Sequence, residues 1–363
     1  MGAQRRVQNA YTASGPGSER EGEPSTIDYL GGNAPRPGAR RPVAPGVHWL
    51  RMPLPFALDH INLWLIEDAS GWTLVDTGVA RDEVKTLWRA LLHDGLGGRP
   101  ITRIIVTHHH PDHLGLAGWL HAELGAPVWM TRTEWLTGTL LHADADARQA
   151  GQQVDLFRRH GLAEPLALRL AERGNRYRAL VSPPPSEYRR LADGERIEIG
   201  AHSWRVVVTT GHAPEHACLY CEELEVLIAG DQVLPKITPN VSLPPSEPGA
   251  DPLAEFLCSL AHLRTLPAGT LVLPSHGRPF RGLRQRIDQM SAHHDDRLEA
   301  VIESCGAPHC AGELLTVLFK RELDTHQLMF AMGECLSHLR HLNVRGELAS
   351  FADARGITRY RRP

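Results

Sequence analysis

Apolar positions between residues 47 and 130 follow two alternating spacings. Short runs rich in Val, Ile, Leu and Trp, separated by turns that contain Asp and Gly, are typical of β-strands. Between these runs, apolar residues three or four positions apart predict amphipathic helices. The elements expected in chain order are strands 47–52, 62–67 and 72–76, helix 81–93, strand 101–107, helix 114–124 and strand 127–130. Strands that alternate with helices in this way predict the α/β fold class.

Residues 131–192 depart from this order, because their apolar spacing is helical and a Ser-Pro-Pro-Pro run closes the segment. We interpret the segment as a helical insertion. Strands then return, and the chain ends in helices followed by a Gly-containing stretch that predicts a small β wing. The later elements expected are strands 196–199, 204–210, 217–221, 226–229 and 271–274, helices 252–265, 284–305, 314–319 and 328–342, and the wing at 346–360.

Composition divides the chain into three parts. Residues 1–46 are rich in Gly, Pro, Ser, Arg and Glu and show almost no apolar periodicity, so we expect a disordered tail. Residues 47–305 are expected to form the main domain, with 131–192 inserted into it. Residues 306–363 are expected to form a small winged-helix-like C-terminal domain.

Net charge and residue counts exclude several classes of protein. The 363 residues carry a net charge of −3 and are 42% apolar, so bulk charge gives no reason to expect nucleic acid or an anionic membrane as partner. No run of about 18 apolar residues and no secretory-type segment is present, so we expect a cytoplasmic protein without a membrane partner. Six cysteines are too few for a disulfide scaffold. Residues 301–363 carry eight Lys and Arg against seven Asp and Glu, which favours packing or a homodimer over DNA binding.

Histidines are abundant, 21 in all, and four potential metal ligands lie within six residues directly after a buried strand. Because alternate residues of an extended chain point the same way, His108 and His110 can converge on one ion, and His109 is expected to point away. Asp112 and His113 lie one step further along and can serve a second ion. Imidazole nitrogen suits zinc and carboxylate suits a harder or bridging position, so this spacing predicts a metal site.

This segment resembles the His-x-His-x-Asp-His motif of the metallo-β-lactamase superfamily. The other motifs of that superfamily follow in order, and the resemblance spans about residues 47–298. It implies a four-layer αββα fold with a helical insertion. The matching segments are Val75-Asp76-Thr77-Gly78, Thr210-Gly211-His212-Ala213-Pro214-Glu215-His216, Ala229-Gly230-Asp231 and Ser275-His276-Gly277.

The resemblance also implies a set of ligands for two Zn²⁺ ions per chain, with Fe or Mn as the alternative metals. A hydroxide held between two such ions is a nucleophile at neutral pH, and no Gly-x-Ser-x-Gly nucleophile motif is present. Asp112 is the candidate catalytic residue as well as a ligand. The assignment gives His108, His110 and His212 to one metal and Asp112, His113 and His276 to the other, with Asp231 joining them and with Asp76 and His216 as residues that orient the ligands.

The resemblance is strongest to the β-lactamase-like-protein-2 group, which has a winged-helix-like end. The runs 230–240 and 293–297 resemble segments of that group. Glyoxalase II-like thioesterases and lactonases share the same ligand types. Some eukaryotic relatives cut single-stranded RNA, so the resemblance implies hydrolysis more specifically than it implies a substrate.

Three functions follow as hypotheses. The first is hydrolysis of a small-molecule ester, above all a thioester such as acyl-CoA or acylglutathione, or else a lactone. Apolar residues and arginines in 131–192 fit an acyl chain on a phosphate-bearing carrier, although a solvated helix face would look the same. The second hypothesis is a single-stranded RNA endonuclease that uses the same metal site. The third is a regulator that binds nucleic acid through residues 306–363.

Overall fold

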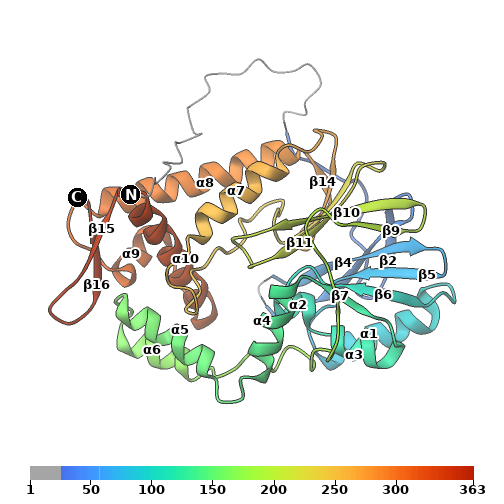
Figure 1. Cartoon of the computed structure of the whole chain (residues 1–363), viewed down its shortest axis with the longest axis horizontal. Coiled ribbons are helices and arrows are strands. Elements are labelled where there is room, and N and C mark those ends of the chain that lie inside the picture. The colour runs from blue at the N-terminus through green and yellow to red at the C-terminus, as the bar shows by residue number, and fades with distance from the viewer. Residues whose placement is uncertain (1–25, 57) are drawn as a thin grey trace, which may run out of the picture.

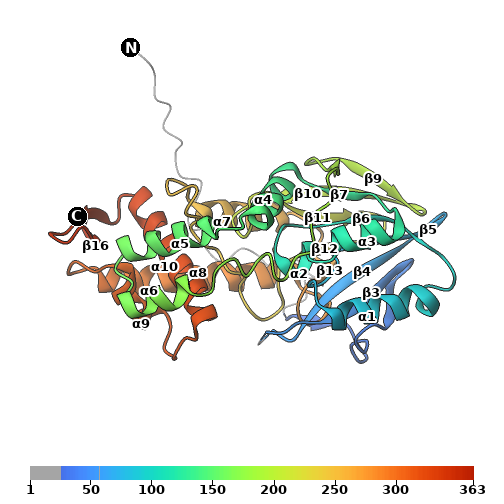
Figure 2. The same cartoon turned by 90° about the horizontal axis from the view of Figure 1, so that it is seen from below.

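Two seven-stranded β-sheets pack face to face and helices cover their outer faces (Figures 1 and 2). This arrangement is seen in a computed structural model that describes residues 26–56 and 58–363. The first sheet has the strand order β2-β3-β4-β5-β6-β7-β8, and the second has the order β1-β14-β13-β12-β11-β10-β9. The fold is therefore α/β, as the apolar pattern predicts, with the αββα arrangement that the resemblance implies.

The first sheet changes from antiparallel to parallel pairing at β5 and β6, and the chain crosses between these two strands through a helix. Its strands are β2 (Arg40–Ala44), β3 (Val47–Pro53), β4 (His60–Asp68), β5 (Gly71–Val75), β6 (Ile101–Ile105), β7 (Val128–Met130) and β8 (Arg189–Arg190). The helices that follow β5 and β6 are α1 (Asp82–Ala90), continued by a wide turn over Leu91–Gly95, α2 (Pro111–Leu114) and α3 (Ala117–Leu124).

The second sheet has one parallel pair, β12 with β13, and long helices lie along its outer face. Its strands are β1 (Asp28–Tyr29), β9 (Arg196–Ile199), β10 (His202–Thr209), β11 (His216–Cys221), β12 (Val226–Gly230), β13 (Leu271–Pro274) and β14 (Phe280–Arg281). The covering helices are α7 (Pro252–Leu263) and α8 (Leu283–Ser304).

Strand periodicity explains how the sheets are held together. In β3 and β4 the residues Trp49 and Trp64 point between the two sheets, whereas Leu50 and Leu63 point toward the outer helices. All four side chains are fully buried. Burial of such side chains contributes about 1.5–3 kcal/mol each, so the layered core holds the strand ends in fixed places.

The inserted helices do not all lie over the first sheet. Phe157 and Leu170 from the insertion share one buried core with Leu314 and Leu336 from the C-terminal segment. The insertion therefore packs largely on the C-terminal module, and both lie beside the sheets (Figure 1). The elements concerned are α4 (Arg132–Ala143), α5 (Arg148–Arg159), α6 (Glu164–Ala171), α9 (Ala311–Leu318), α10 (Thr325–Val344), β15 (Ala349–Ala352) and β16 (Thr358–Arg361).

The expected tail 1–46 needs correction in its second half. Residues 26–46 contain β1 and β2, which extend the two sheets at their edges. Tyr29 also packs its ring 6.5 Å from that of Phe280. Main-chain pairing to a sheet edge stabilises a segment whose side chains have little apolar surface, and composition does not record it. Residues 1–25 lie outside the described residues.

Among the described helices, none is long and apolar enough to cross a lipid bilayer.

Candidate metal centre

The candidate ligands lie on loops at one edge of the two sheets. Asp76 directly follows β5, the 108–113 segment follows β6, Asp231 directly follows β12, and His276 lies two residues after β13. Ligand-binding loops commonly gather at the carboxyl ends of parallel strands, and here both sheets have such a pair. Side chains far apart in the sequence therefore meet at this edge.

Four of the predicted ligands form a first group. The ring nitrogens His108 Nε2 and His110 Nδ1 are 2.8 Å apart, and His108 Nε2 is 3.3 Å from His212 Nε2. His212 Nε2 is 3.6 Å from Asp231 Oδ2. One ligand atom from each residue lies within 4.8 Å of the others, which is close enough for one ion to contact all four.

Asp112, His113 and His276 form a second group that faces the same carboxylate. His276 Nε2 is 3.3 Å from Asp112 Oδ2 and 3.4 Å from Asp231 Oδ1. His113 Nε2 is 3.5 Å from Asp231 Oδ2. The Asp231 carboxylate thus lies between the two groups, which is the position of a bridging ligand. The structure brings together all seven residues that the sequence predicts as ligands.

Unpartnered polar atoms mark where a cation fits. The buried polar atoms without a hydrogen-bond partner among the described residues include His113 Nε2 and Asp231 Oδ1 of this cluster. A buried polar atom that lacks a partner costs about 1–3 kcal/mol, so such atoms need a further ligand. Five imidazoles and two carboxylates are the donor set that zinc and similar divalent ions prefer. The residues present therefore fit the expected metal ions.

Charge in the cluster also favours a bound cation. Burial raises the pKa of the Asp231 carboxyl, but the neighbouring His276 and His113 lower it well below its usual value. Burial lowers the pKa of His276, but the carboxylates of Asp231 and Asp112 outweigh burial and raise it to about 10. The carboxylates therefore stay ionised and create a place that stabilises positive charge.

Asp76 orients His113, as the sequence predicts. His113 Nδ1–H donates to Asp76 Oδ2 at 2.8 Å, which leaves Nε2 to face the cluster. The other carboxylate oxygen, Asp76 Oδ1, accepts from the backbone N–H of Thr107 at 2.8 Å. Asp76 has a left-handed backbone with φ of +62°, a conformation that costs free energy in a residue other than glycine and is common at functional sites.

His216 orients Asp231. Its Nε2 accepts from the backbone N–H of Asp231 at 3.1 Å. Burial, followed by the charge of His212, lowers the pKa of His216 to about 3, so the ring is a neutral acceptor. A Cβ on Gly230 would lie 2.3 Å from this nitrogen, and Gly230 has φ of +54°. Only glycine allows this close approach without a shift of the ring.

Two backbone carbonyls orient further ligands, and the sequence analysis did not identify them. His276 Nδ1–H donates to the carbonyl of His60 at 2.8 Å, and His212 Nδ1–H donates to the carbonyl of Asn240 at 2.8 Å. A carbonyl partner on Nδ1 selects the tautomer whose Nε2 is free to bind a metal. Every residue has a carbonyl, so sequence alone offers no signal for these contacts.

His109 points away from the cluster, as strand alternation predicts. Its Nδ1–H donates to Glu134 Oε2 at 2.5 Å, and Glu134 Oε1 accepts from the backbone N–H of Glu215 at 2.7 Å. The Tyr177 hydroxyl donates to the carbonyl of His109 at 2.5 Å. Glu134 on α4 therefore joins the two loops that carry His108 and His212, and nothing near it in the sequence indicated this role.

The loop after Asp231 is held by helices α8 and α10. Arg286 on α8 donates to the carbonyls of Leu234 at 2.5 Å and Ile237 at 2.8 Å. The backbone N–H of Leu243 donates to the carbonyl of Gly333 on α10 at 3.2 Å. A Cβ on Gly333 would lie 2.3 Å from the hydroxyl oxygen of Ser242. Helices α8 and α10 thus fix the loop whose carbonyl at Asn240 orients His212.

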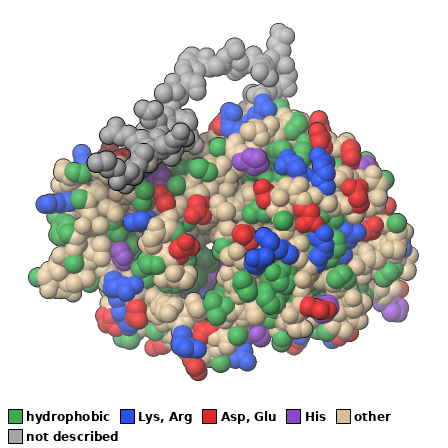
Figure 3. Space-filling view, viewed as in Figure 1, with side chains coloured by type: hydrophobic (Ala, Val, Ile, Leu, Met, Phe, Trp, Pro, Cys, Tyr) green, Lys and Arg blue, Asp and Glu red, His purple; other side chains and the backbone are tan. Residues whose placement is uncertain are grey.

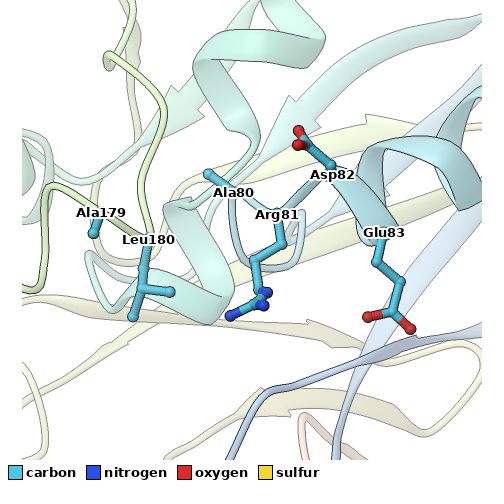
Figure 4. Close-up of a pocket in the computed structure, with 6 residues that line it drawn as sticks. All are labelled: Ala80, Arg81, Asp82, Glu83, Ala179 and Leu180. Atoms are coloured by element: carbon cyan, nitrogen blue, oxygen red, sulfur yellow. The ribbon is translucent and has the colours of Figure 1, made fainter.

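A surface pocket of about 330 Å³ lies elsewhere, where α1 begins (Figure 4). None of its lining residues is a candidate metal ligand, so we do not assign it to the reaction. It is lined by Ala80, Arg81, Asp82, Glu83, Ala179 and Leu180.

Solved structures of similar proteins cover nearly the whole chain. A beta-lactamase domain protein from Burkholderia ambifaria is 46% identical, covers 93% of this chain and 98% of its own, and superposes with a TM-score of 0.87. The metallo-beta-lactamase family protein TTHA1429 from Thermus thermophilus is 34% identical, with 88% and 99% covered and a TM-score of 0.74.

A curated relative and two family models agree with these structures. The probable metallo-hydrolase YqjP of Bacillus subtilis is 24% identical over 307 residues, which are 83% of this chain and 93% of the relative. Residues 298–363 match the metallo-beta-lactamase-like C-terminal domain. Residues 57–276 match the metallo-beta-lactamase superfamily. The chain therefore belongs to the metallo-beta-lactamase superfamily, whose members bind divalent metals, and is a metallo-hydrolase.

Proposed function

We propose that this metallo-hydrolase binds two zinc ions and cleaves a small-molecule ester, with a thioester such as acyl-CoA or acylglutathione as the substrate class and a lactone as the second choice. The observation that carries the proposal is the position of Asp231. Its carboxylate faces His212 in one ligand group and both His113 and His276 in the other, at 3.4–3.6 Å. Such an arrangement suits two ions that share one carboxylate.

Two metal ions held here would supply hydroxide near neutral pH and would polarise the ester carbonyl. The residues of the chain contribute orientation. Asp76 and the carbonyls of His60 and Asn240 each fix one imidazole, so these ligands need little reorganisation on binding. Asp112 is 17% exposed, more than the ligands beside it, so it is placed to contact both a metal and an entering substrate.

A relative and the charge of the insertion support a thioester. An atrochrysone carboxyl ACP thioesterase of Aspergillus fumigatus is 22% identical over 69% of this chain and 45% of that protein. A thioester on a carrier brings phosphate with it, and guanidinium groups bind phosphate in bidentate fashion. Burial lowers the pKa of Arg173, neighbouring Arg176 lowers it further and the Asp324 carboxylate opposes this, so two cations and one carboxylate lie close together beside α10.

Arg359, near the C-terminus, offers little to nucleic acid. Arg359 Nε donates to Asp353 at 2.9 Å and its Nη1 donates to Glu313 at 3.1 Å. A guanidinium group that is paired with two carboxylates is a poor phosphate ligand, which favours a small-molecule substrate over a nucleic-acid partner.

The proposal is tested by giving zinc-loaded protein four substrates: acyl-CoA, acylglutathione, homoserine lactone and labelled single-stranded RNA. We expect thioester turnover that Asp112→Ala abolishes. Asp155→Ala removes a carboxylate from the exposed face of α5 and serves as the matched control. RNA cleavage that depends on Asp112, without thioester turnover, would overturn the proposal in favour of an endonuclease.

A further inference from the structure

The carbonyls of His60 and Asn240, which orient two of the ligands, belong to segments that lead to one group of aromatic rings. Phe56 lies four residues before His60, in the turn between β3 and β4. On the other side, the side-chain amide of Asn240 donates to the carbonyl of Phe330 on α10 at 3.3 Å. Phe56 is therefore four residues along the chain from His60, whose carbonyl contacts His276. The carbonyl of Phe330 is one hydrogen bond from Asn240, whose own carbonyl contacts His212.

His326, in the first turn of α10, lies between these two rings. Its ring stacks on Phe56 with centroids 5.4 Å apart and planes 15° apart. It meets Phe330 edge to face, with centroids 4.8 Å apart. We call Phe56, His326 and Phe330 the aromatic cluster. Phe330 remains 36% exposed, so the cluster presents apolar surface to solvent beside a polar site.

The insertion forms a second connection, between α10 and the 108–113 segment that carries ligands. Arg173 donates to the carbonyl of Thr325 at 3.3 Å, and Tyr177 donates to the carbonyl of His109. The stretch 173–177 thus runs from the first turn of α10 to the loop that carries the ligands. Figure 3 shows a hollow in the face of the molecule where Figure 1 has the space between α10 and α4.

We infer that the aromatic cluster binds the acyl group of the substrate. The inference rests on the proposed function and adds a preference for acyl groups long or flat enough to cover Phe330. An acyl chain whose carbonyl lies at the metal centre must extend over the surface around it. Aromatic rings held by packing and by hydrogen bonds offer apolar area at little cost in conformational entropy.

Packing between the C-terminal part and the sheets is the competing explanation for the same rings. If these rings only pack, Phe330→Ala should make the protein less stable and should weaken the binding of all substrates equally. If the cluster binds acyl groups, the same substitution should weaken the binding of long acyl groups and leave that of short ones unchanged. Dependence on chain length therefore separates the two explanations.

The experiment uses isothermal titration calorimetry on zinc-loaded protein with S-octyl-CoA and S-methyl-CoA, thioethers that lack the cleavable carbonyl. We expect the wild type to bind S-octyl-CoA at least about tenfold more tightly than S-methyl-CoA, because seven further methylene groups leave water. Phe330→Ala should remove most of that preference, and Phe330→Leu should keep much of it. Phe351→Ala is the matched control, since Phe351 is 39% exposed on β15 outside the cluster.

A preference that survives in Phe330→Ala, or an equal loss for both probes, would overturn the inference. So would a wild type that binds the two probes equally or fails to bind S-octyl-CoA. No bond breaks in these titrations. If the wild type prefers S-octyl-CoA but hydrolyses no thioester, the proposed function fails while the inference about the aromatic cluster stands.

Discussion

Two histidine clusters in this molecule look alike in geometry and differ in charge. The metal centre is one. The other is formed by His294 on α8 and by Glu334 and His338 on α10, whose ligand atoms also lie within 4.8 Å of one another. His294 Nδ1 and His338 Nε2 are 3.1 Å apart, a separation similar to those between the ring nitrogens of the metal centre. Distance alone would assign a metal to both clusters.

The carboxylates distinguish them. In the second cluster the carboxylate of Glu334 is paired with Arg297 at 2.6 Å, so its negative charge is already neutralised by a side chain of the protein. Burial there lowers the pKa of His338 to about 4 and that of His294 to about 2. In the metal centre, by contrast, burial lowers the pKa of His276 but the carboxylates of Asp231 and Asp112 outweigh burial and raise it to about 10. The second cluster favours neutral imidazoles packed in a core, whereas the first favours bound positive charge.

The largest expected effect separates these clusters directly. Asp231→Ala removes the carboxylate shared by both ligand groups, so we expect loss of bound zinc and a fall in kcat/KM of about 10³-fold or more. Glu334→Gln makes a similar change in the second cluster and should leave the zinc content at that of the wild type. Elemental analysis of the purified variants measures both. Full zinc content in Asp231→Ala, or zinc loss in Glu334→Gln, would contradict the comparison.

A smaller effect is expected from the residue that orients His113. Asp76→Asn keeps the shape of the side chain but removes its charge, so zinc affinity should fall about 10–100-fold. Asp251→Asn is the matched control, because Asp251 pairs with His341 at 3.1 Å, away from the metal ligands. Competition with a chromophoric chelator gives the affinities. Equal weakening in the two variants would mean that Asp76 acts through general stability.

The cluster at residues 108–113 could be predicted because it follows an apolar strand, whereas His212, Asp231 and His276 were identified through the resemblance to the superfamily motifs. His108 and Asp231 lie within three residues of buried strands, so the strand pattern and the motif locate them together. The orienting carbonyls of His60 and Asn240 had no such signal, since their role depends on which loop folds against which imidazole. Glu134 was missed for the same reason, because its partner His109 lies 25 residues earlier.

The same limit applies to the fold. Buried strands such as β4 and β12 have a strong apolar pattern, and the sequence predicts them close to their observed bounds. The edge strands β1 and β2 have little apolar surface and form through main-chain hydrogen bonds to a neighbour, which no local pattern records. The helical character of the insertion could be predicted, but apolar faces do not specify their partner, and Phe157 packs with the C-terminal helices.

The smallest expected effect concerns stability in acid and tests the charge of the second cluster. The pKa of His338 is about 4 in the folded state, below the ordinary 6.5, so the unfolded chain binds more protons between these values. The contribution of His338 to the free energy of unfolding should therefore be constant well above pH 6.5 and should fall as the pH is lowered, by about 1–2 kcal/mol between pH 7 and pH 5. His338→Gln cannot titrate, so its unfolding free energy should fall less over the same interval. Urea unfolding with saturating zinc gives the unfolding free energies of wild type and variant. The acid sensitivity of the metal centre is common to both proteins and cancels in the difference between them. Parallel pH profiles would mean that burial does not hold His338 neutral. The charge contrast between the two histidine clusters would then fail, and their similar geometry does not distinguish them.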